Sequence, residues 1–461
     1  MTSDRQTVPR FRSRWFLPAL LGITLVALAL RLWTAAATQV DVPIRNDARE
    51  YVSYAANLKL YGAYSSDPRV LVGTQAGTPI PDARRPPGYA LFLVPFFRLD
   101  DLGGFIHRVV QAQAWIGTCV VLLIGLLAVR LLGQGWALAV AAATALSPHL
   151  IVYVPYLLSE TLYSLAFLIF VAFLAVGLTT AVPWRRTAFL SLAGLALGLT
   201  CLVRPTLDQL VWILLTAALL LPQFRRQWPA IVIFLLGFLT VMAPWWARTS
   251  QIPGNGQSHA MAITLHQGSY PDLMRDGDPA TFGYPYRGDP VSPAAESSVP
   301  AALRNIASKF HEHPWQMSRW YLIGKPIQLF AWNEQSGWMD LFEYPVLRSP
   351  WLKSPGLIVL TSIMKGVHPV IILLALAGTL LAFVPAAARG LPLPADAMVG
   401  LRVAAFVHAY FLLVHLAALP LSRYSVPFRP LTYLMAAYGL MCLGALVGRW
   451  RERSRPAEVP S

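Results

Sequence analysis

The sequence predicts an all-α, polytopic membrane protein with about ten transmembrane helices, external juxtamembrane helices and one long external loop. Of its 461 residues, 56% are hydrophobic and only 13% are charged, whereas about a quarter of the residues in a soluble domain are charged. Several apolar runs reach the roughly 20 residues that cross a hydrocarbon core. Backbone groups in lipid must be paired within the chain, so these runs are expected to be helices rather than open sheet.

Ten apolar runs follow one another along the chain, and the third of them is short. They are 15–37, 105–129, 137–146, 150–179, 187–203, 206–221, 228–246, 356–384, 399–419 and 426–447. A further run, 91–97, is too short to span and predicts a juxtamembrane helix. The segment 301–330 has an amphipathic pattern and predicts a helix that rests on the membrane.

Arginines orient the runs, because they lie before the first run, between alternate runs and after the last. They are Arg5, Arg10, Arg12, Arg14, Arg130, Arg185, Arg186, Arg225, Arg226, Arg389, Arg449, Arg451, Arg453 and Arg455. Placing all of them in the cytoplasm requires an even number of spans, which ten satisfies. The predicted division is a cytoplasmic tail 1–14, a transmembrane catalytic module 15–246 with a first external loop 38–104, a long external loop 247–354, C-terminal helices 355–448 and a cytoplasmic tail 449–461.

Composition and motifs exclude several classes of function. The net charge of +15 is explained mostly by positive-inside anchoring and anionic lipid, and nucleic-acid binding is not expected without a soluble basic domain. The three cysteines lie in apolar runs and form no CxxC pair. His311 and His313 do not share a helix face, and there is no Walker motif, HExxH or dinucleotide fingerprint.

Two acids are the candidate catalytic residues. Asp47 follows the first apolar run, where a carboxylate can accept a proton from a hydroxyl nucleophile; the alternative is that it caps the short amphipathic helix 49–60. Glu160 lies near the external end of an otherwise apolar helix, where an acid usually faces a cavity or a partner. Its alternative is a structural ion pair with an arginine such as Arg204.

Arginines near external helix ends are the candidate phosphate ligands. Arg85 precedes two prolines, Arg204 precedes Pro205 and Arg423 precedes Tyr424. A guanidinium fork matches phosphate oxygens in a bidentate manner. The alternative for each of them is an interfacial arginine that extends toward water.

An ordered set of motifs resembles the polyprenyl-phosphate-sugar-dependent glycosyltransferases of the glycosyltransferase-C superfamily, which include protein O-mannosyltransferases and lipid A aminoarabinose transferases. The motifs are Asp47-Ala48-Arg49-Glu50-Tyr51, Gly62-Ala63-Tyr64-Ser65, Arg85-Pro86-Pro87-Gly88-Tyr89, Ser159-Glu160-Thr161, Leu202-Val203-Arg204-Pro205, Pro244-Trp245-Trp246-Ala247-Arg248 and Arg423-Tyr424-Ser425-Val426-Pro427. The chain departs from the family at Ala48, where many members have Glu, and at Glu50, where the aminoarabinose transferases tend to have Arg.

The resemblance implies inverting transfer of a sugar from a polyprenyl-phosphate donor to an envelope acceptor, on the external face of the plasma membrane. Asp47 and Glu160 would be catalytic, and a divalent metal is possible but not favoured. The implied substrate-binding residues are Glu50, Tyr51, Tyr54, Arg84, Arg85, Tyr89, Arg204, His266, Lys325, Arg423 and Tyr424. The alternatives are a flippase or transporter for a lipid-linked sugar, or a non-catalytic protein of envelope assembly.

Overall fold

The computed structural model describes residues 14–220, 228–254, 259–273, 281, 284–333, 340–386 and 391–453. The described chain is helical apart from one small pair of strands, and it is a multi-pass integral membrane protein. Eight of its helices are long and apolar enough to cross a membrane. They are α1 (Phe16–Ala37), α4 (Leu102–Leu132), α7 (Glu160–Thr179), α8 (Pro183–Val203), α11 (Trp228–Thr249), α19 (Pro355–Leu381), α20 (Ala395–Ala417) and α22 (Arg429–Arg453).

The predicted count of ten spans is not reached among the described residues. The run 137–146 lies in α5 (Gln134–Leu146), and the run 206–221 forms a 3-10 turn, η2 (Pro205–Leu207), and α9 (Leu210–Leu220). With a rise of 1.5 Å per residue, α5 and α9 are about 20 and 17 Å long, well short of a hydrocarbon core of about 30 Å. Seven of the orienting arginines lie outside the described residues, as do most of both tails; they are Arg5, Arg10, Arg12, Arg225, Arg226, Arg389 and Arg455.

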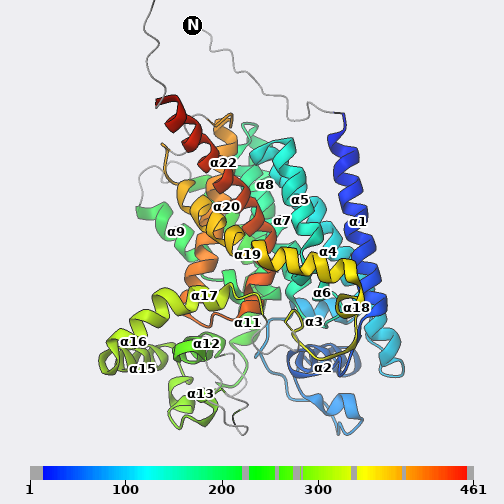
Figure 1. Ribbon diagram of the computed structural model, residues 1–461. Coiled ribbons are helices and arrows are strands. Elements are labelled where there is room, and N and C mark those ends of the chain that lie inside the picture. Colours follow the sequence, from blue (N-terminus) through cyan, green and yellow to red (C-terminus); the bar gives the residue numbers. More distant parts are fainter. Residues whose placement is uncertain are drawn as a thin grey trace, which may run out of the picture.

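The long helices form a bundle whose two ends differ (Figure 1). The start of α1 and the end of α22 lie at one end, and α2, α3 and the helices between α11 and α19 gather at the other, which we call the loop-bearing end. The shorter elements of the described chain include α2 (Asn46–Tyr61), η1 (Pro68–Val72), α3 (Gly88–Leu93), α6 (Pro148–Val152), α12 (Ala260–Gln267), η4 (Pro271–Leu273), α13 (Pro285–Gly288), α14 (Ser292–Ala295), α15 (Val299–Glu312), α16 (Pro314–Arg319), η6 (Trp320–Gly324), α17 (Lys325–Leu329), α18 (Pro350–Lys353), α21 (Ser422–Ser425) and η7 (Val426–Phe428).

Two contacts tie the segment before α19 to the end of α1. Strand β1 (Gln39–Val40) pairs in antiparallel fashion with β2 (Val346–Arg348). The indole nitrogen of Trp351 donates to the hydroxyl of Thr34 at 3.0 Å. Segments about 300 residues apart in the sequence are thereby held side by side at the loop-bearing end.

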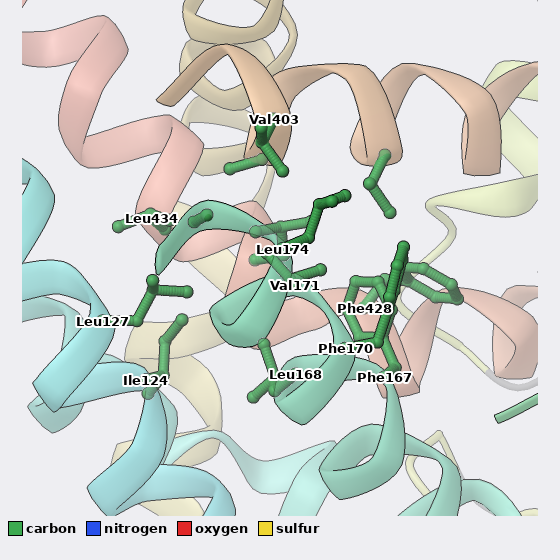
Figure 2. Packing of buried hydrophobic residues seen from close by; sticks show 14 of the residues in the cluster. Ile124, Leu127, Phe167, Leu168, Phe170, Val171, Leu174, Val403, Phe428 and Leu434 are labelled. Atoms are coloured by element: carbon green, nitrogen blue, oxygen red, sulfur yellow. The ribbon is translucent and has the colours of Figure 1, made fainter. Parts of the chain in front are cut away.

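The core of the bundle is built around α7. Phe167, Leu168, Phe170, Val171 and Leu174 of this helix pack against side chains of α4, α20, η7 and α22 (Figure 2). The first third of the chain and the last third therefore share one apolar core, which fixes the ends of these helices relative to one another.

Glycines bring two helix pairs into close backbone contact. A Cβ atom added to Gly194 of α8 would lie 2.0 Å from a carbonyl oxygen of α11, that of Phe234. A Cβ added to Gly439 of α22 would lie 2.2 Å from the carbonyl oxygen of Leu374 of α19. Small residues allow such close approach between membrane helices, where dispersion contacts and interhelical hydrogen bonds drive association.

Candidate active site

Seven charged residues from distant parts of the chain meet at the loop-bearing end. Their elements are the first turns of α2 and α7, the segments before α3 and β2, the end of α8, and α21. We call this set the arginine–carboxylate network, and its members are Asp47, Glu50, Arg85, Glu160, Arg204, Glu343 and Arg423.

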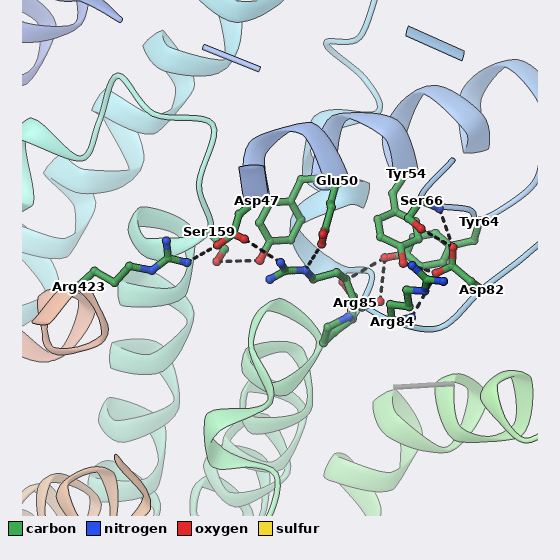
Figure 3. Close-up of polar contacts among 12 residues, drawn as sticks. Asp47, Glu50, Tyr54, Tyr64, Ser66, Asp82, Arg84, Arg85, Ser159 and Arg423 are labelled. Atoms are coloured by element: carbon green, nitrogen blue, oxygen red, sulfur yellow. Dashed lines mark hydrogen bonds and ion pairs between the residues drawn. The ribbon is translucent and has the colours of Figure 1, made fainter. Parts of the chain in front are cut away.

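The network begins at Asp47, which is held by two arginines (Figure 3). Its Oδ1 atom accepts from Nη2 of Arg85 at 2.8 Å, and its Oδ2 atom contacts Nη2 of Arg423. The Nε atom of Arg85 donates to Oε2 of Glu50 at 2.6 Å. The N-cap of α2 is Arg45, without a side-chain cap, so the described contacts of Asp47 are ion pairs and not the capping bond considered from the sequence.

Arg423 connects Asp47 to two buried glutamates. Its Nη1 atom donates to Oε1 of Glu343 at 2.8 Å, and its Nε atom lies 3.8 Å from Oε1 of Glu160. The same Glu160 oxygen accepts from Nη1 of Arg204 at 2.7 Å. The ion pair between Glu160 and Arg204, which was the alternative to a functional role for Glu160, is therefore present, and it lies within the same network as Asp47.

The network is buried on one side and open on the other. The side chains of Glu343, Glu160, Arg423 and Arg204 are 2%, 3%, 13% and 14% exposed, whereas those of Arg85 and Glu50 are 30% and 45% exposed. Four carboxylates face three guanidinium groups, so the formal charge is −1. An anionic ligand must therefore displace a carboxylate from an arginine, and the Arg85–Glu50 pair is the most accessible place to do so.

The arginines control the protonation of Asp47. Burial alone would raise the pKa of this carboxyl, but the guanidinium groups of Arg423 and Arg85 more than reverse that effect and hold the pKa well below its usual range. A depressed pKa means that ionised Asp47 stabilises the fold above its ordinary pKa of 3.8, and that this contribution is lost as the pH falls further. In this paired state the carboxylate is a weak base.

Aromatic rings cover the arginines. The guanidinium of Arg85 lies 5.3 Å from the ring centre of Tyr51, and that of Arg204 lies 5.0 Å from the ring centre of Tyr424. The hydroxyl of Tyr51 is 3.4 Å from that of Ser159, directly before Glu160. These contacts restrict the rotamers of both arginines and add cation–π attraction.

A second polar cluster supports the loop that carries Arg85 (Figure 3). The Asp82 carboxylate accepts from the Tyr54 hydroxyl and from the backbone nitrogen of Arg84. The hydroxyl of Tyr64 donates to the carbonyl of Arg85 at 3.1 Å. The Arg248 side chain, near the end of α11, donates to the carbonyls of Tyr64 and Asp82. In the contacts that the structure describes, Tyr54 and Arg84 therefore help to hold this loop in place.

Three further predicted substrate-binding residues make other contacts. The Tyr89 hydroxyl, which is buried, donates to Oε1 of Gln113 at 2.8 Å. The ring nitrogens of His266 face Ser292 and Asn305. The Lys325 amine donates to the carbonyls of Ala417 and Ala418 at the end of α20. The described hydrogen bonds of these three residues do not join them to the arginine–carboxylate network. Their role in substrate binding stays a prediction.

Glu343 is the network member that sequence reasoning missed. It lies in the segment Leu341-Phe342-Glu343-Tyr344, whose other three side chains are also buried. A single acid inside an apolar stretch of a loop is the signal that could have identified it. The described residues contain no group of three or more His, Cys, Asp or Glu side chains placed to hold a metal ion.

Comparison with known proteins relates the chain to others by fold only. No protein-family model matches the sequence, and no curated protein sequence matches it. The structure is similar to those of the glycosyltransferase-C enzymes AglB and ArnT, at low sequence identity.

Three solved structures illustrate this similarity. The archaeal oligosaccharyltransferase AglB from Archaeoglobus fulgidus, in complex with an inhibitory peptide and a dolichol-phosphate, is 12% identical with a TM-score of 0.48, over 98% of this chain and 53% of that one. The A. fulgidus oligosaccharyltransferase tethered with an acceptor peptide is 14% identical with a TM-score of 0.49, over 96% and 51%. ArnT from Cupriavidus metallidurans bound to undecaprenyl phosphate is 15% identical with a TM-score of 0.41, over 96% and 81%. This chain thus spans about half the length of the oligosaccharyltransferases.

Proposed function

We propose that this protein is an inverting glycosyltransferase that moves a sugar from a polyprenyl-phosphate donor to an envelope acceptor on the external face of the membrane. The observation that carries the proposal is the arginine–carboxylate network at the loop-bearing end of the helix bundle. A lipid donor fits this position, because its tail can remain in the bilayer while its phosphosugar reaches the end of the helices.

The arginines are proposed to hold the phosphate. Arg85 is the most exposed of the three and is expected to meet the phosphate first, exchanging Glu50 for it. Arg423 and Arg204 are less exposed and are proposed to stabilise the negative charge that develops on the leaving phosphate. The bidentate fork of a guanidinium matches this task better than an ammonium does.

Asp47 is proposed to orient the acceptor and to receive its proton. The acceptor oxygen attacks the anomeric carbon, the bond between that carbon and the phosphate oxygen breaks, and the phosphate keeps the electron pair. A phosphate that draws Arg85 and Arg423 away from Asp47 would relieve the effect that depresses the pKa of this carboxyl. Donor binding would thus convert a weak base into a competent one, while Glu160 keeps Arg204 in place.

The test is a transfer assay with purified protein in lipid nanodiscs. A panel of synthetic polyprenyl-phosphate sugars is supplied together with envelope lipid and glycan extracts, and mass spectrometry follows release of the polyprenyl phosphate and the gain in mass of the acceptor. Arg85→Ala should abolish most of the release. Arg69→Ala is the matched control, because Arg69 lies in the same loop and forms an exposed ion pair with Asp67 outside the network.

Two results would contradict the proposal. One is release that is the same in Arg85→Ala and in the wild type. The other is movement of an intact labelled donor between the leaflets of proteoliposomes without any release of polyprenyl phosphate, which would identify the flippase alternative.

A further inference from the structure

A small cavity lies beside Glu160, and neither Arg204 nor Arg423 is among the residues that line it. Its lining includes Arg31 of α1, Gly117 of α4, Tyr153, and Glu160, Thr161 and Ser164 of α7. Its volume is about 10 Å³, and a cavity needs about 10–15 Å³ of such space to hold one water molecule. We propose that one water molecule occupies this cavity and links Arg31 to Glu160, which makes Arg31 a positioning residue of the site; its catalytic consequence rests on the proposed function.

Two buried polar atoms, one on each of two residues that line this cavity, carry the inference. The Nε atom of Arg31 is a donor and the Oε2 atom of Glu160 is an acceptor, and neither has a hydrogen-bond partner within the part of the chain that the structure describes. The two residues are only 1% and 2% exposed. Buried polar groups in folded proteins are almost always hydrogen-bonded to protein or to an ordered water. A water molecule can accept from Arg31 and donate to Glu160 at the same time.

Gly117 provides the space for this arrangement. A Cβ atom at this position would lie 2.9 Å from Nε of Arg31 and 3.6 Å from Cγ2 of Thr161, the neighbour of Glu160. Any larger residue would occupy the region between the first transmembrane helix and the start of α7. The glycine therefore keeps open the route by which a water molecule can touch both charged groups.

A purely structural role for Arg31 explains only part of its geometry. Its Nη1 and Nη2 atoms donate to the carbonyls of Ala145 and Thr144 at distances of 3.3 and 3.4 Å, so they satisfy the C-terminal end of α5. This capping role does not use Nε, and it does not require polar space beside Glu160. The remaining nitrogen is the one placed at the cavity.

The link has a defined effect on Glu160. The Oε1 atom of Glu160 already interacts with Arg204 and Arg423, whereas a water molecule in the cavity would satisfy its Oε2 atom. A carboxylate held at both oxygens cannot rotate, so the arginines that it holds stay aligned for the phosphate. Misplacement of such groups by about 1 Å can reduce a rate by about 100-fold.

The first experiment observes the water molecule directly and does not depend on activity. A cryo-EM or crystal structure of the full chain, at a resolution that shows ordered water, should contain a density peak within about 2.6–3.3 Å of both Nε of Arg31 and Oε2 of Glu160. A structure with ordered water elsewhere but no peak here, or with the two side chains turned apart, would overturn the inference.

The second experiment compares two glycines of α4. Gly117→Ala fills the cavity without changing a charged group and should lower the transfer rate about 10- to 100-fold, while the dissociation constant for undecaprenyl phosphate stays within about twofold because the phosphate is held by Arg85, Arg204 and Arg423. Gly125→Ala is the control, because its Cβ atom would crowd Leu20 at 2.5 Å, in an apolar contact away from the cavity.

The outcomes separate the two proposals. Gly125→Ala should lower thermal stability and leave the rate per folded molecule unchanged. Equal rates for Gly117→Ala and the wild type, or equal losses for both variants, would refute the positioning role. A wild-type protein that transfers no sugar while the water peak is present would refute the proposed function and leave the Arg31 link established.

Discussion

At the scale of single residues, the exposed pair of Arg85 and Glu50 decides how easily a phosphate enters the network. An exposed ion pair contributes about 0.2–1 kcal/mol, so removing the charge of Glu50 frees Arg85 at little cost to the fold. We expect Glu50→Gln to lower the dissociation constant for undecaprenyl phosphate about 2- to 5-fold, measured by isothermal titration calorimetry in nanodiscs. Asp67→Asn, which frees the exposed Arg69 instead, should leave this dissociation constant unchanged. Weaker donor binding by Glu50→Gln would show that Glu50 itself binds the donor.

Asp47 can be tested separately from the phosphate ligands. Asp47→Asn keeps the shape of the side chain and removes its charge, so transfer should fall by about 10²–10⁴-fold if this carboxylate receives or orients the acceptor proton. Donor binding should be retained, because the variant leaves Arg85 and Arg423 in place. Single-turnover kinetics with saturating donor measure the first effect, and calorimetry measures the second. Near-wild-type transfer would remove Asp47 from the mechanism.

The network residues that could be predicted from the sequence are charged residues whose position near a predicted membrane span indicated a function. Asp47, Glu160, Arg204 and Arg423 stand at or near the ends of apolar runs, where a charge requires a partner, and the structure places all four in one network. Glu343 joins them through its ion pair with Arg423 and lies just before β2, which pairs with β1, far away in the sequence. No local pattern reports that pairing. Lys325 is predicted from the sequence to bind substrate, but in the structure its amine donates to a backbone carbonyl at the end of α20.

At the scale of helices, hydropathy identifies apolar segments but does not fix how many of them cross the membrane. The runs 137–146 and 206–221 are apolar, but the helices α5 and α9 that they form are short, and each begins directly after a local break in the backbone. Gly133, with φ of +86°, ends α4 and allows the chain to turn directly into α5. Pro205 begins a 3-10 turn before α9. Tertiary packing against α4 and α1 accommodates the shorter α5.

The contact between α19 and α22 depends on glycine, and this can be measured on one helix. A Cβ atom on Gly439 would meet a backbone carbonyl of α19, whereas a Cβ on Gly444 of the same helix has nothing within 4 Å. We expect Gly439→Ala to destabilise the protein by about 1–3 kcal/mol, as overpacking does, and to lower its midpoint of thermal unfolding. Gly444→Ala should match the wild type. Equal midpoints for the two variants would show that α19 is free to shift.

At the scale of the whole molecule, the distribution of arginines predicts which side of the membrane each end of the bundle faces. The end of α22 lies opposite the loop-bearing end (Figure 1) and carries Arg449; Arg130 lies at the end of α4, and Arg185 and Arg186 lie at the start of α8. Basic residues concentrate in cytoplasmic connections. The loop-bearing end, with the arginine–carboxylate network, is therefore proposed to face outward, where a donor with an external headgroup can reach it.

Labelling of introduced cysteines tests this orientation in intact cells or spheroplasts. Ile80 in the loop between α2 and α3 is 81% exposed, and Trp184 in the first turn of α8 is 68% exposed, so both positions should react where a reagent can reach them. In a Cys119→Ser background, which removes the exposed native cysteine, a membrane-impermeant maleimide should label Ile80→Cys from outside. Trp184→Cys should react only after the membrane is permeabilised. Its reaction at that stage is the control, because it proves that the thiol is reactive. The reverse pattern would place the network in the cytoplasm and would require a donor presented from that side.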